Sequence, residues 1–260
     1  MMCFLETIAV AFSMYSALPM PQFDWNERNM RYALCAFPLV GAVCGLLWWG
    51  WDALCAYLAL PAILRGAVRC ALPALVTGGI HLDGYADTAD ALASHAGCAR
   101  RQEILRDPHC GAFAVIRLCV YFVMWFALCC AAEASARTEW CVGLSFVLSR
   151  TASGLALACL PIAEGSSLAR TFADAADRRR VRVVLSLLLA VCAVLACFKL
   201  GAAGGAMLLA LFAVFTQAAH TAKTGFGGLS GDLAGWFLVK AEFWMLAAYL
   251  AAEYGKAAMG

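Results

Sequence analysis

Charged residues are scarce in this chain. They make up 14% of its 260 residues, whereas 64% of the residues are hydrophobic and the mean hydropathy is +0.79. Soluble domains usually contain about 25% charged and about 45–50% apolar residues. The composition therefore excludes an ordinary soluble domain, and the shortage of polar sequence excludes a disordered chain.

Two kinds of motif are also missing. No basic stripe is interleaved with aromatic residues and the formal net charge is only +2, so nothing indicates nucleic-acid binding. The 14 cysteines include no C-x-x-C pair, so neither a zinc site nor a redox site is indicated. Most of the cysteines lie within apolar segments, where cysteine is typically a small buried hydrophobe.

Long apolar runs dominate the rest of the chain. They cover residues 38–60, 61–80, 113–132, 140–160, 183–198, 202–219 and 236–252. The runs are continuous rather than alternating, which excludes a transmembrane barrel. Since a helix needs roughly 20 residues to cross the hydrocarbon core, we expect an all-α polytopic integral membrane bundle of about seven transmembrane helices. Residues 1–260 form a single domain in this interpretation.

The first twenty residues are apolar but differ from a signal peptide. They lack a basic start, carry Glu6 early, and end in Leu18-Pro19-Met20-Pro21 instead of a small-residue cleavage site. We therefore expect an additional N-terminal helix that is interfacial or re-entrant.

Basic residues gather in one set of loops. These loops are 22–37, 81–112, 161–182 and 221–235, and they hold Arg28, Arg31, Arg100, Arg101, Arg106, Arg170, Arg178, Arg179, Arg180, Arg182 and Lys223. The opposite set of loops holds only Arg137, Lys199 and Lys256. The positive-inside rule predicts that the first set faces the cytoplasm.

Carboxylates are concentrated in residues 78–90, Gly78-Gly79-Ile80-His81-Leu82-Asp83-Gly84-Tyr85-Ala86-Asp87-Thr88-Ala89-Asp90. The spacing of Asp83, Asp87 and Asp90 puts them on one face of a helix. Three neighbouring anions repel one another unless a cation neutralises them, and Mg²⁺ commonly pairs a few carboxylates with substrate phosphates. The alternative is a solvated helix face at the membrane edge. His81 points to a different face and is a general base, a donor that orients the aspartates, or a structural residue.

Further polar residues indicate phosphate binding. The pair Arg106 and Asp107, followed by a proline turn, would present a guanidinium group to a phosphate. Arg150 lies inside an apolar run, where a charge is by default a functional hypothesis. The alternatives are an ordinary interfacial pair for Arg106 and Asp107 and a position nearer the surface for Arg150.

The stretch 223–235 combines a basic residue, an acid and several glycines. Lys223, Gly227, Gly228 and Gly231 would hold a diphosphate, with backbone N–H groups cradling its oxygens. Asp232 would complete the metal site, or would instead cap the last helix. Close packing of glycines before a terminal span is the alternative for the whole stretch.

Other charged residues fall within apolar runs. Glu242 is a further carboxylate in the last run, and Arg65 and Arg69 lie in the run 61–80. Asp52 is a candidate partner for these two arginines, whose role the sequence leaves open.

Together these motifs resemble the cobalamin synthase (adenosylcobinamide-GDP ribazoletransferase) family over nearly the whole chain. The matching strings are Leu18-Pro19-x-Pro21, Gly78-Gly79-x-His81-Leu82-Asp83-Gly84-x-Ala86-Asp87-Thr88-x-Asp90, Glu103-Ile104-x-Arg106-Asp107 with Gly111, Ser149-Arg150, and Gly227-Gly228-x-x-Gly231-Asp232-x-x-Gly235, ending toward Glu242. The family often has Thr-Arg where this chain has Ser16-Ala17, Gly in place of Ala114, and Glu in place of Val239.

The resemblance implies a Mg²⁺-dependent enzyme of a bacterial or archaeal cytoplasmic membrane. It would join adenosylcobinamide-GDP to α-ribazole, or to α-ribazole 5′-phosphate, with release of GMP, to give adenosylcobalamin or its 5′-phosphate. The implied catalytic residues are His81, Asp83, Asp87 and Asp90. The implied metal ligands are Asp83, Asp87, Asp90 and Asp232, and the implied phosphate-binding residues are Arg106, Asp107, Arg150, Lys223, Gly227, Gly228 and Gly231. The partners are the two substrates and the lipid bilayer, without nucleic acid; a homo-oligomer, the general base and the number of metal ions are left open.

Two other functions compete with this interpretation. A CDP-alcohol phosphotransferase also has an aspartate cluster, but its D-G-x-x-A-R string is absent because Asp87 stands where that pattern needs alanine. A cation transporter should place its acids near the bilayer midplane and often has repeats. Here we find no internal repeat, and the acids cluster at one edge of an apolar run.

Overall fold

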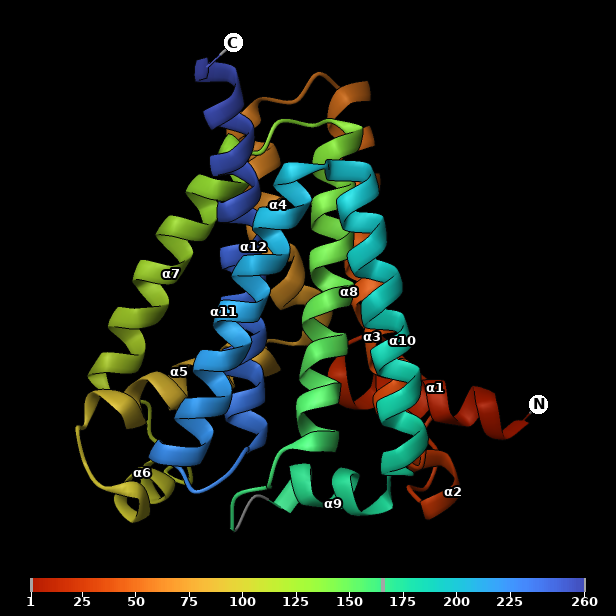
Figure 1. Cartoon of the computed structure of the whole chain (residues 1–260), viewed down its shortest axis with the longest axis vertical. Coiled ribbons are helices and arrows are strands. Elements are labelled where there is room, and N and C mark those ends of the chain that lie inside the picture. Colours follow the sequence, from red (N-terminus) through yellow and green to blue (C-terminus); the bar gives the residue numbers. More distant parts are fainter. Residues whose placement is uncertain (1, 165–166, 260) are drawn as a thin grey trace.

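The structure is a computed structural model that describes residues 2–164 and 167–259. Its helices are α1 (Met2–Tyr15), α2 (Glu27–Met30), α3 (Ala33–Tyr57), α4 (Ala62–Thr77), α5 (Ile80–Ala93), α6 (Cys98–Ile104), α7 (Ala112–Ala131), α8 (Ala136–Cys159), α9 (Ser167–Ala175), α10 (Arg178–Leu200), α11 (Ala202–Gly225) and α12 (Gly231–Met259). Within the described residues, six of them are long and apolar enough to cross a membrane, namely α3, α7, α8, α10, α11 and α12. These helices run side by side as one bundle (Figure 1), which confirms the expected polytopic helical fold.

The centre of the bundle is formed by α8 and α12. In the most apolar 18-residue segment of each helix, 83% of α8 and 72% of α12 is buried inside the protein, compared with 22% of α7 and 22% of α10. Helix α8 packs along α3 and α10, and α12 packs along α11 and α5. The outer helices therefore present apolar faces to lipid, while α8 and α12 carry the residues that the protein interior can use.

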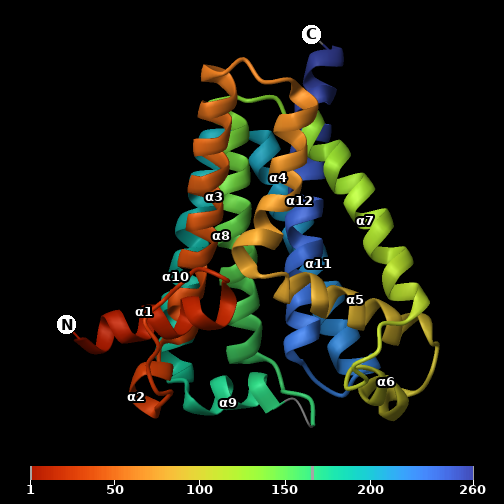
Figure 2. The same ribbon diagram turned by 180° about the vertical axis from the view of Figure 1, so that it is seen from behind.

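The run 61–80 is the one that departs from a simple span. Helix α4 has 16 residues and ends at Gly78 and Gly79, whose φ angles are +65° and +80°. Two consecutive residues in the left-handed region turn the chain sharply, and glycine adopts this conformation without a steric penalty. Helix α5 therefore leaves α4 at an angle of 93° and runs across the bundle instead of continuing through it (Figure 2).

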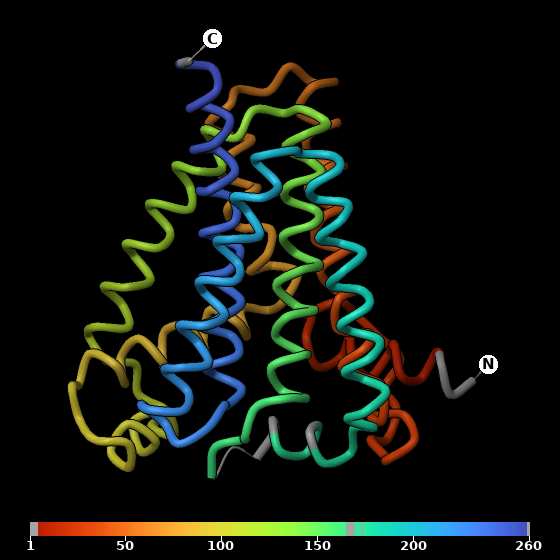
Figure 3. Tube along the Cα trace, viewed as in Figure 1, coloured from red at the N-terminus to blue at the C-terminus, as the bar shows by residue number. Residues whose placement is uncertain are grey.

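The long connections all lie at one end of the bundle. In Figures 1 and 2 this end carries α2, α6 and α9, with α1 and α5 lying across it, whereas the opposite end has short turns and the C-terminus. The Cα trace shows the same division (Figure 3). The three polar loops 81–112, 161–182 and 221–235 thus share one end, as the sequence predicted, and α1 lies across the bundle axis as expected of a helix that does not cross.

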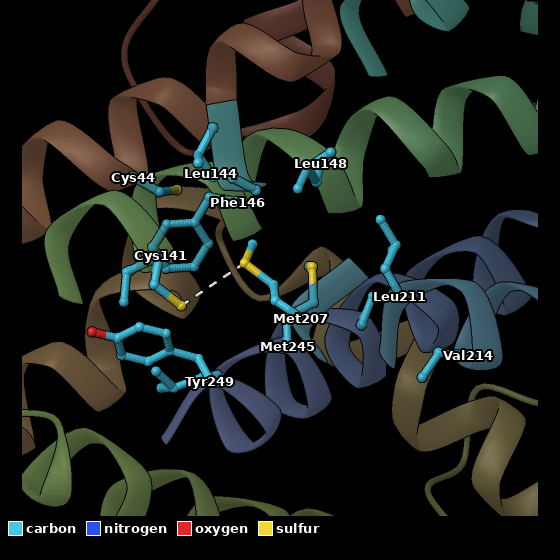
Figure 4. Packing of buried hydrophobic residues seen from close by; sticks show 14 of the residues in the cluster. Cys44, Cys141, Leu144, Phe146, Leu148, Met207, Leu211, Val214, Met245 and Tyr249 are labelled. Carbon is cyan, nitrogen blue, oxygen red and sulfur yellow. Dashed lines mark hydrogen bonds between the residues drawn. The ribbon is translucent and has the colours of Figure 1, made fainter. Parts of the chain in front are cut away.

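The largest cluster of buried side chains joins α3, α8, α11 and α12. Figure 4 shows Phe146, Met207 and Met245 interlocking, with the Cys141 and Met207 sulfur atoms 4.0 Å apart. The 13 cysteines from Cys35 to Cys197 are all free thiols, and several of them are buried. This agrees with the interpretation of cysteine here as a small apolar residue.

A buried ion pair closes the opposite end of the bundle. Arg69 on α4 donates from Nε to the Asp52 Oδ1 atom at 2.7 Å and from Nη1 to the Cys129 carbonyl at 2.9 Å. Its guanidinium group also stacks over the Trp48 ring, 4.9 Å from the centroid. The proposed partner Asp52 is therefore confirmed, and Arg69 has a structural role that ties α3, α4 and α7 together.

Candidate active site

Helix α5 crosses the first turn of α12 at two glycines. A Cβ atom at Gly84 would lie 2.8 Å from both the Cα and the carbonyl oxygen of Asp232, and one at Gly235 would lie 3.1 Å from the His81 carbonyl oxygen. Only glycine allows the two backbones to approach this closely. The contact brings Asp232 next to the aspartate face of α5, although the two segments are far apart in the sequence.

The aspartates of α5 form an acidic face beside Asp232. Partial burial raises the pKa of the Asp87 carboxyl to about 6, and repulsion by the other three carboxylates is the second cause of this rise. Asp83, Asp87 and Asp90 form no salt bridge with any described residue. An uncompensated group of this kind favours binding of a cation.

Asp90 occupies the far end of this acidic face. A Cβ atom at Gly111 would collide with the Asp90 carboxylate, so a larger residue where the chain enters α7 would displace this carboxylate. This contact gives a structural reason for the glycine that follows Arg106 and Asp107 in the motif. The spacing of the motif alone did not provide that reason.

A cavity of about 410 Å³ opens at this end of the bundle. Small-molecule sites usually have volumes of about 300–1,000 Å³, so it is large enough for a nucleoside-sized group. Its walls come from α1, α3, α5, α6, α8, α9 and α12 and from the segments before α9 and α12. The Asp83 and Asp232 residues both line it, next to Ser230.

The cavity brings together five of the site residues predicted from the sequence. They are His81, Asp83, Arg106, Gly231 and Asp232. The predicted residues outside its lining are Asp87, Asp90, Asp107, Arg150, Lys223, Gly227 and Gly228. Asp107 is exposed and accepts a hydrogen bond from the His109 backbone N–H at 3.0 Å, and Lys223 is exposed near the end of α11.

His81 is 8% exposed and stands at the boundary between α5 and the apolar interior. Its ring lies 5.7 Å from the Phe37 ring, and its Nε2 atom has no hydrogen-bond partner among the described residues. Its Nε2 atom is therefore an unsatisfied buried polar atom, in a residue that lines the cavity two positions before Asp83.

Arg150 lies behind the cavity wall and is fully buried. It donates from Nη1 to the Glu242 carboxylate at 2.6 Å, and the Ser149 hydroxyl donates to the same carboxylate oxygen at 3.0 Å. Pairing compensates both charges in the apolar interior. The structure therefore gives Arg150 a protein partner, which was not identified from the sequence because the two residues lie 92 positions apart.

The glycine-rich segment before α12 is partly engaged by the protein itself. The Gly228 N–H donates to the Ala222 carbonyl at 2.9 Å, and the Leu229 N–H donates to the Pro161 carbonyl at 2.8 Å. The backbone N–H groups at the start of α12 remain directed to the helix N-terminus, where anions are favoured. Of the segment predicted to bind phosphate, the residues that remain for this role are Gly231 and Asp232, at the start of α12.

Ser230 and Gln102 are site residues that the sequence interpretation missed. The Ser230 hydroxyl accepts a hydrogen bond from the Leu233 N–H at 3.2 Å, so this serine provides the cap for which Asp232 was the candidate. Gln102 lies one helical turn before Arg106 and donates to the Phe226 carbonyl at 2.7 Å. Gln102 could have been found from its spacing of four residues before Arg106, which puts both on one side of a helix. The cap could have been found from the serine that stands three residues before Leu233.

Apolar helices long enough to cross a membrane, with a cavity lined by Asp83 and Asp232 at one end of the bundle, define the class of polytopic helical membrane proteins. The chain matches the sequence profile of the cobalamin-5-phosphate synthase family over residues 7–250, and it belongs to this family.

Curated relatives cover almost the whole chain. A protein of Lachnoclostridium phytofermentans is 40% identical over 97% of this chain and 96% of its own length. One of Pseudomonas putida is 33% identical over 90% of this chain and 92% of its own length, and one of Clostridium perfringens is 28% identical over 94% of this chain and 96% of its own length. All three are named adenosylcobinamide-GDP ribazoletransferase, and no solved structure matches the chain.

Proposed function

We propose that this protein joins adenosylcobinamide-GDP to α-ribazole at the cavity between α5 and α12, with release of GMP. With α-ribazole 5′-phosphate as the acceptor, the product is adenosylcobalamin 5′-phosphate. The observation that carries the proposal is the meeting of Asp83 and Asp232 in one cavity, in a chain that belongs to the cobalamin-5-phosphate synthase family. The acids lie on α5 and at the start of α12, toward the end of the bundle that carries the long connections (Figure 1), which argues against a transport site at the bilayer midplane.

The reaction is a transfer between two oxygen atoms at one phosphorus. A ribose hydroxyl of α-ribazole attacks the phosphorus attached to cobinamide, the bond from this phosphorus to the GMP oxygen breaks, and the hydroxyl proton is released. The protein's main contribution is to position both reactants and to compensate charge on the phosphates. Arg106 supports this role, because it lines the cavity and its Nη2 atom donates a hydrogen bond to the Glu164 carbonyl at 3.1 Å.

Mg²⁺ is the proposed cofactor, held by Asp83, Asp87, Asp90 and Asp232 together with the diphosphate of the donor. The donor set fits, because the carboxylates supply the hard oxygen ligands that Mg²⁺ prefers. Among the described residues, no group of three or more His, Cys, Asp or Glu side chains is placed to hold a metal ion. The four carboxylates as they stand therefore do not form a complete metal site, and the donor diphosphate and water would supply further ligands. A bound Mg²⁺ would neutralise charge on the transferred phosphoryl group.

Release of GMP tests the function. Purified protein in lipid should release GMP from adenosylcobinamide-GDP only when both α-ribazole and Mg²⁺ are present. The matched control omits α-ribazole, and it separates transfer from hydrolysis. A protein that releases no GMP under any of these conditions, or one that carries cations across vesicle membranes instead, contradicts the proposed function.

The active end is proposed to face the cytoplasm, because the basic residues are concentrated in its loops. Cysteine-accessibility labelling of His95→Cys, on a background without other cysteines, tests this orientation. His95 is exposed between α5 and α6, so a thiol introduced there is open to reagents. We expect labelling only from the cytoplasmic side; labelling only from the opposite side would overturn the orientation.

A further inference from the structure

Two cations lie inside membrane-spanning helices without a carboxylate partner. Arg117, in the second turn of α7, and Lys240, in the third turn of α12, form no salt bridge with any described residue. Glu242, two residues after Lys240, is already paired with Arg150 in the interior. Because a charge within a span is costly, an ionisable residue there is by default a functional hypothesis.

The two cations share one place although they come from different helices. The Lys240 Nζ atom donates to the Gln217 side chain at 2.6 Å and lies 4.2 Å from the centroid of the Trp236 ring. Neutral groups therefore hold this amine in position without balancing its charge. The Arg117 charge is close enough to repel that of Lys240, and it also acts on Tyr85. Each cation thus raises the energy of the other.

This cation pair, Arg117 and Lys240, is separate from the acidic face of α5. Tyr85 follows Asp83 by two residues, which is about 200° around a helix, so it points to the side of α5 away from that face. Arg117 lies one turn before Tyr121, whose ring centroid is 5.5 Å from that of Tyr85. The cation pair therefore lies on the side of α5 that is turned away from the aspartates.

The surroundings of the cation pair are apolar and open. Arg117 is exposed and Lys240 is half-buried. On α7, Ile116 is 55% and Val120 is 57% exposed, and Trp244, one turn after Lys240 on α12, is 49% exposed. In Figures 1 and 2, α7 diverges from α11 and α12 toward the end of the bundle that carries α5 and α6. In a membrane these exposed side chains contact lipid.

We propose that Arg117 and Lys240 bind the headgroup phosphate of an anionic phospholipid, whose acyl chains lie on the exposed apolar side chains of α7 and α12. Basic residues between helices near a membrane surface favour anionic headgroups. The net charge selects the class of lipid, because an anionic headgroup balances the two cations whereas a zwitterionic headgroup brings a cation of its own. The long arginine and lysine side chains reach the phosphate level from within the span. This site is independent of the proposed function.

Lipid retention tests the site. The full-length protein is reconstituted in vesicles of equal parts phosphatidylglycerol and phosphatidylcholine and extracted in detergent, and the lipid that remains bound is quantified by mass spectrometry. The wild type should retain phosphatidylglycerol in preference to phosphatidylcholine. Arg117→Gln and Lys240→Gln should each lower this preference about fivefold, and together about 25-fold, the effect expected for basic groups near a membrane surface. Arg117→Lys and Lys240→Arg keep the charge and should keep the preference, which separates loss of charge from loss of folding.

Lys199→Gln is the matched control. Lys199 is also an exposed lysine over a tryptophan ring, 5.0 Å from the Trp140 centroid, but it lies on α10 at the opposite end of the bundle. The arginine beside it, Arg137, is paired with Glu253. This variant should leave the preference for phosphatidylglycerol unchanged.

Three results would overturn the lipid site. The first is an unchanged preference in the glutamine variants, or an equal loss in Lys199→Gln. The second is displacement of phosphatidylglycerol by inorganic phosphate beyond that caused by chloride at the same ionic strength, which would assign the cation pair to free phosphate. The third is a raised KM for adenosylcobinamide-GDP in Arg117→Gln, which would assign it to the substrate diphosphate. GMP release by the wild type is measured separately, so failure of the lipid site leaves the proposed function standing.

Discussion

Asp83→Ala, Asp87→Ala and Asp90→Ala should each abolish GMP release while the protein accumulates in the membrane at the wild-type level. The three carboxylates share one face of α5 and have no cationic partner among the described residues, so removing one removes a ligand or a charge that the Mg²⁺–diphosphate complex needs. Removing one also relieves repulsion, so loss of folding is not the expected cause of the lost activity.

The measurement compares initial rates of GMP release at saturating Mg²⁺ with the amount of folded protein in the membrane. Glu27→Ala is the control, because Glu27 is an exposed carboxylate at the same end, on α2, and does not line the cavity. Near-wild-type rates in two of the three aspartate variants would show that the acidic face does not hold the metal.

Asp232→Asn should lower turnover by orders of magnitude and shift the Mg²⁺ requirement to higher concentration. Asparagine caps a helix about as well as aspartate, so a capping role predicts little change. The structure assigns the cap bond to the Ser230 hydroxyl, and Asp232 lines the cavity together with Asp83. Loss of the negative charge at an unchanged shape is therefore the only large difference in this variant.

The measurement is turnover across a Mg²⁺ titration for the wild type and Asp232→Asn. A curve that coincides with that of the wild type would leave Asp232 without a part in the metal site. It would not affect the conclusions on the three aspartates of α5, which belong to a separate helix.

The sequence predicted the parts of the site that depend on local periodicity. The spacing of Asp83, Asp87 and Asp90 fixes them on one helical face whatever surrounds the helix. The apolar runs likewise determine the spans, and the distribution of basic residues divides the loops into two sets. These patterns are encoded within a few turns of chain, so they can be recognised without knowing the tertiary structure.

Long-range pairing could not be derived in the same way. Arg150 was interpreted as a phosphate ligand because an unpaired arginine inside a membrane is costly, but its partner Glu242 lies on another helix, 92 positions away. The cavity lining is a similar case, since Tyr15, Phe37 and Phe172 come from three helices and share no sequence pattern. Only the packing of α1 against α3, and of α9 against α2 and α8, reveals that they line one cavity.

The bend after α4 shows an intermediate situation. Gly78 and Gly79 were recognised as residues that permit close approach, yet the run 61–80 still suggested a straight span. The left-handed conformation of both residues depends on how α5 packs against α12, because glycine permits this conformation but does not require it.

Identification of both products by mass spectrometry tests the central claim most directly. Purified protein supplied with adenosylcobinamide-GDP, α-ribazole and Mg²⁺ should yield adenosylcobalamin and GMP in equal amounts, because the hydroxyl attacks the phosphorus attached to cobinamide. Formation of cobinamide phosphate with a guanylylated ribazole, which requires attack at the other phosphorus, or of cobinamide phosphate and GMP without a joined product, would contradict it.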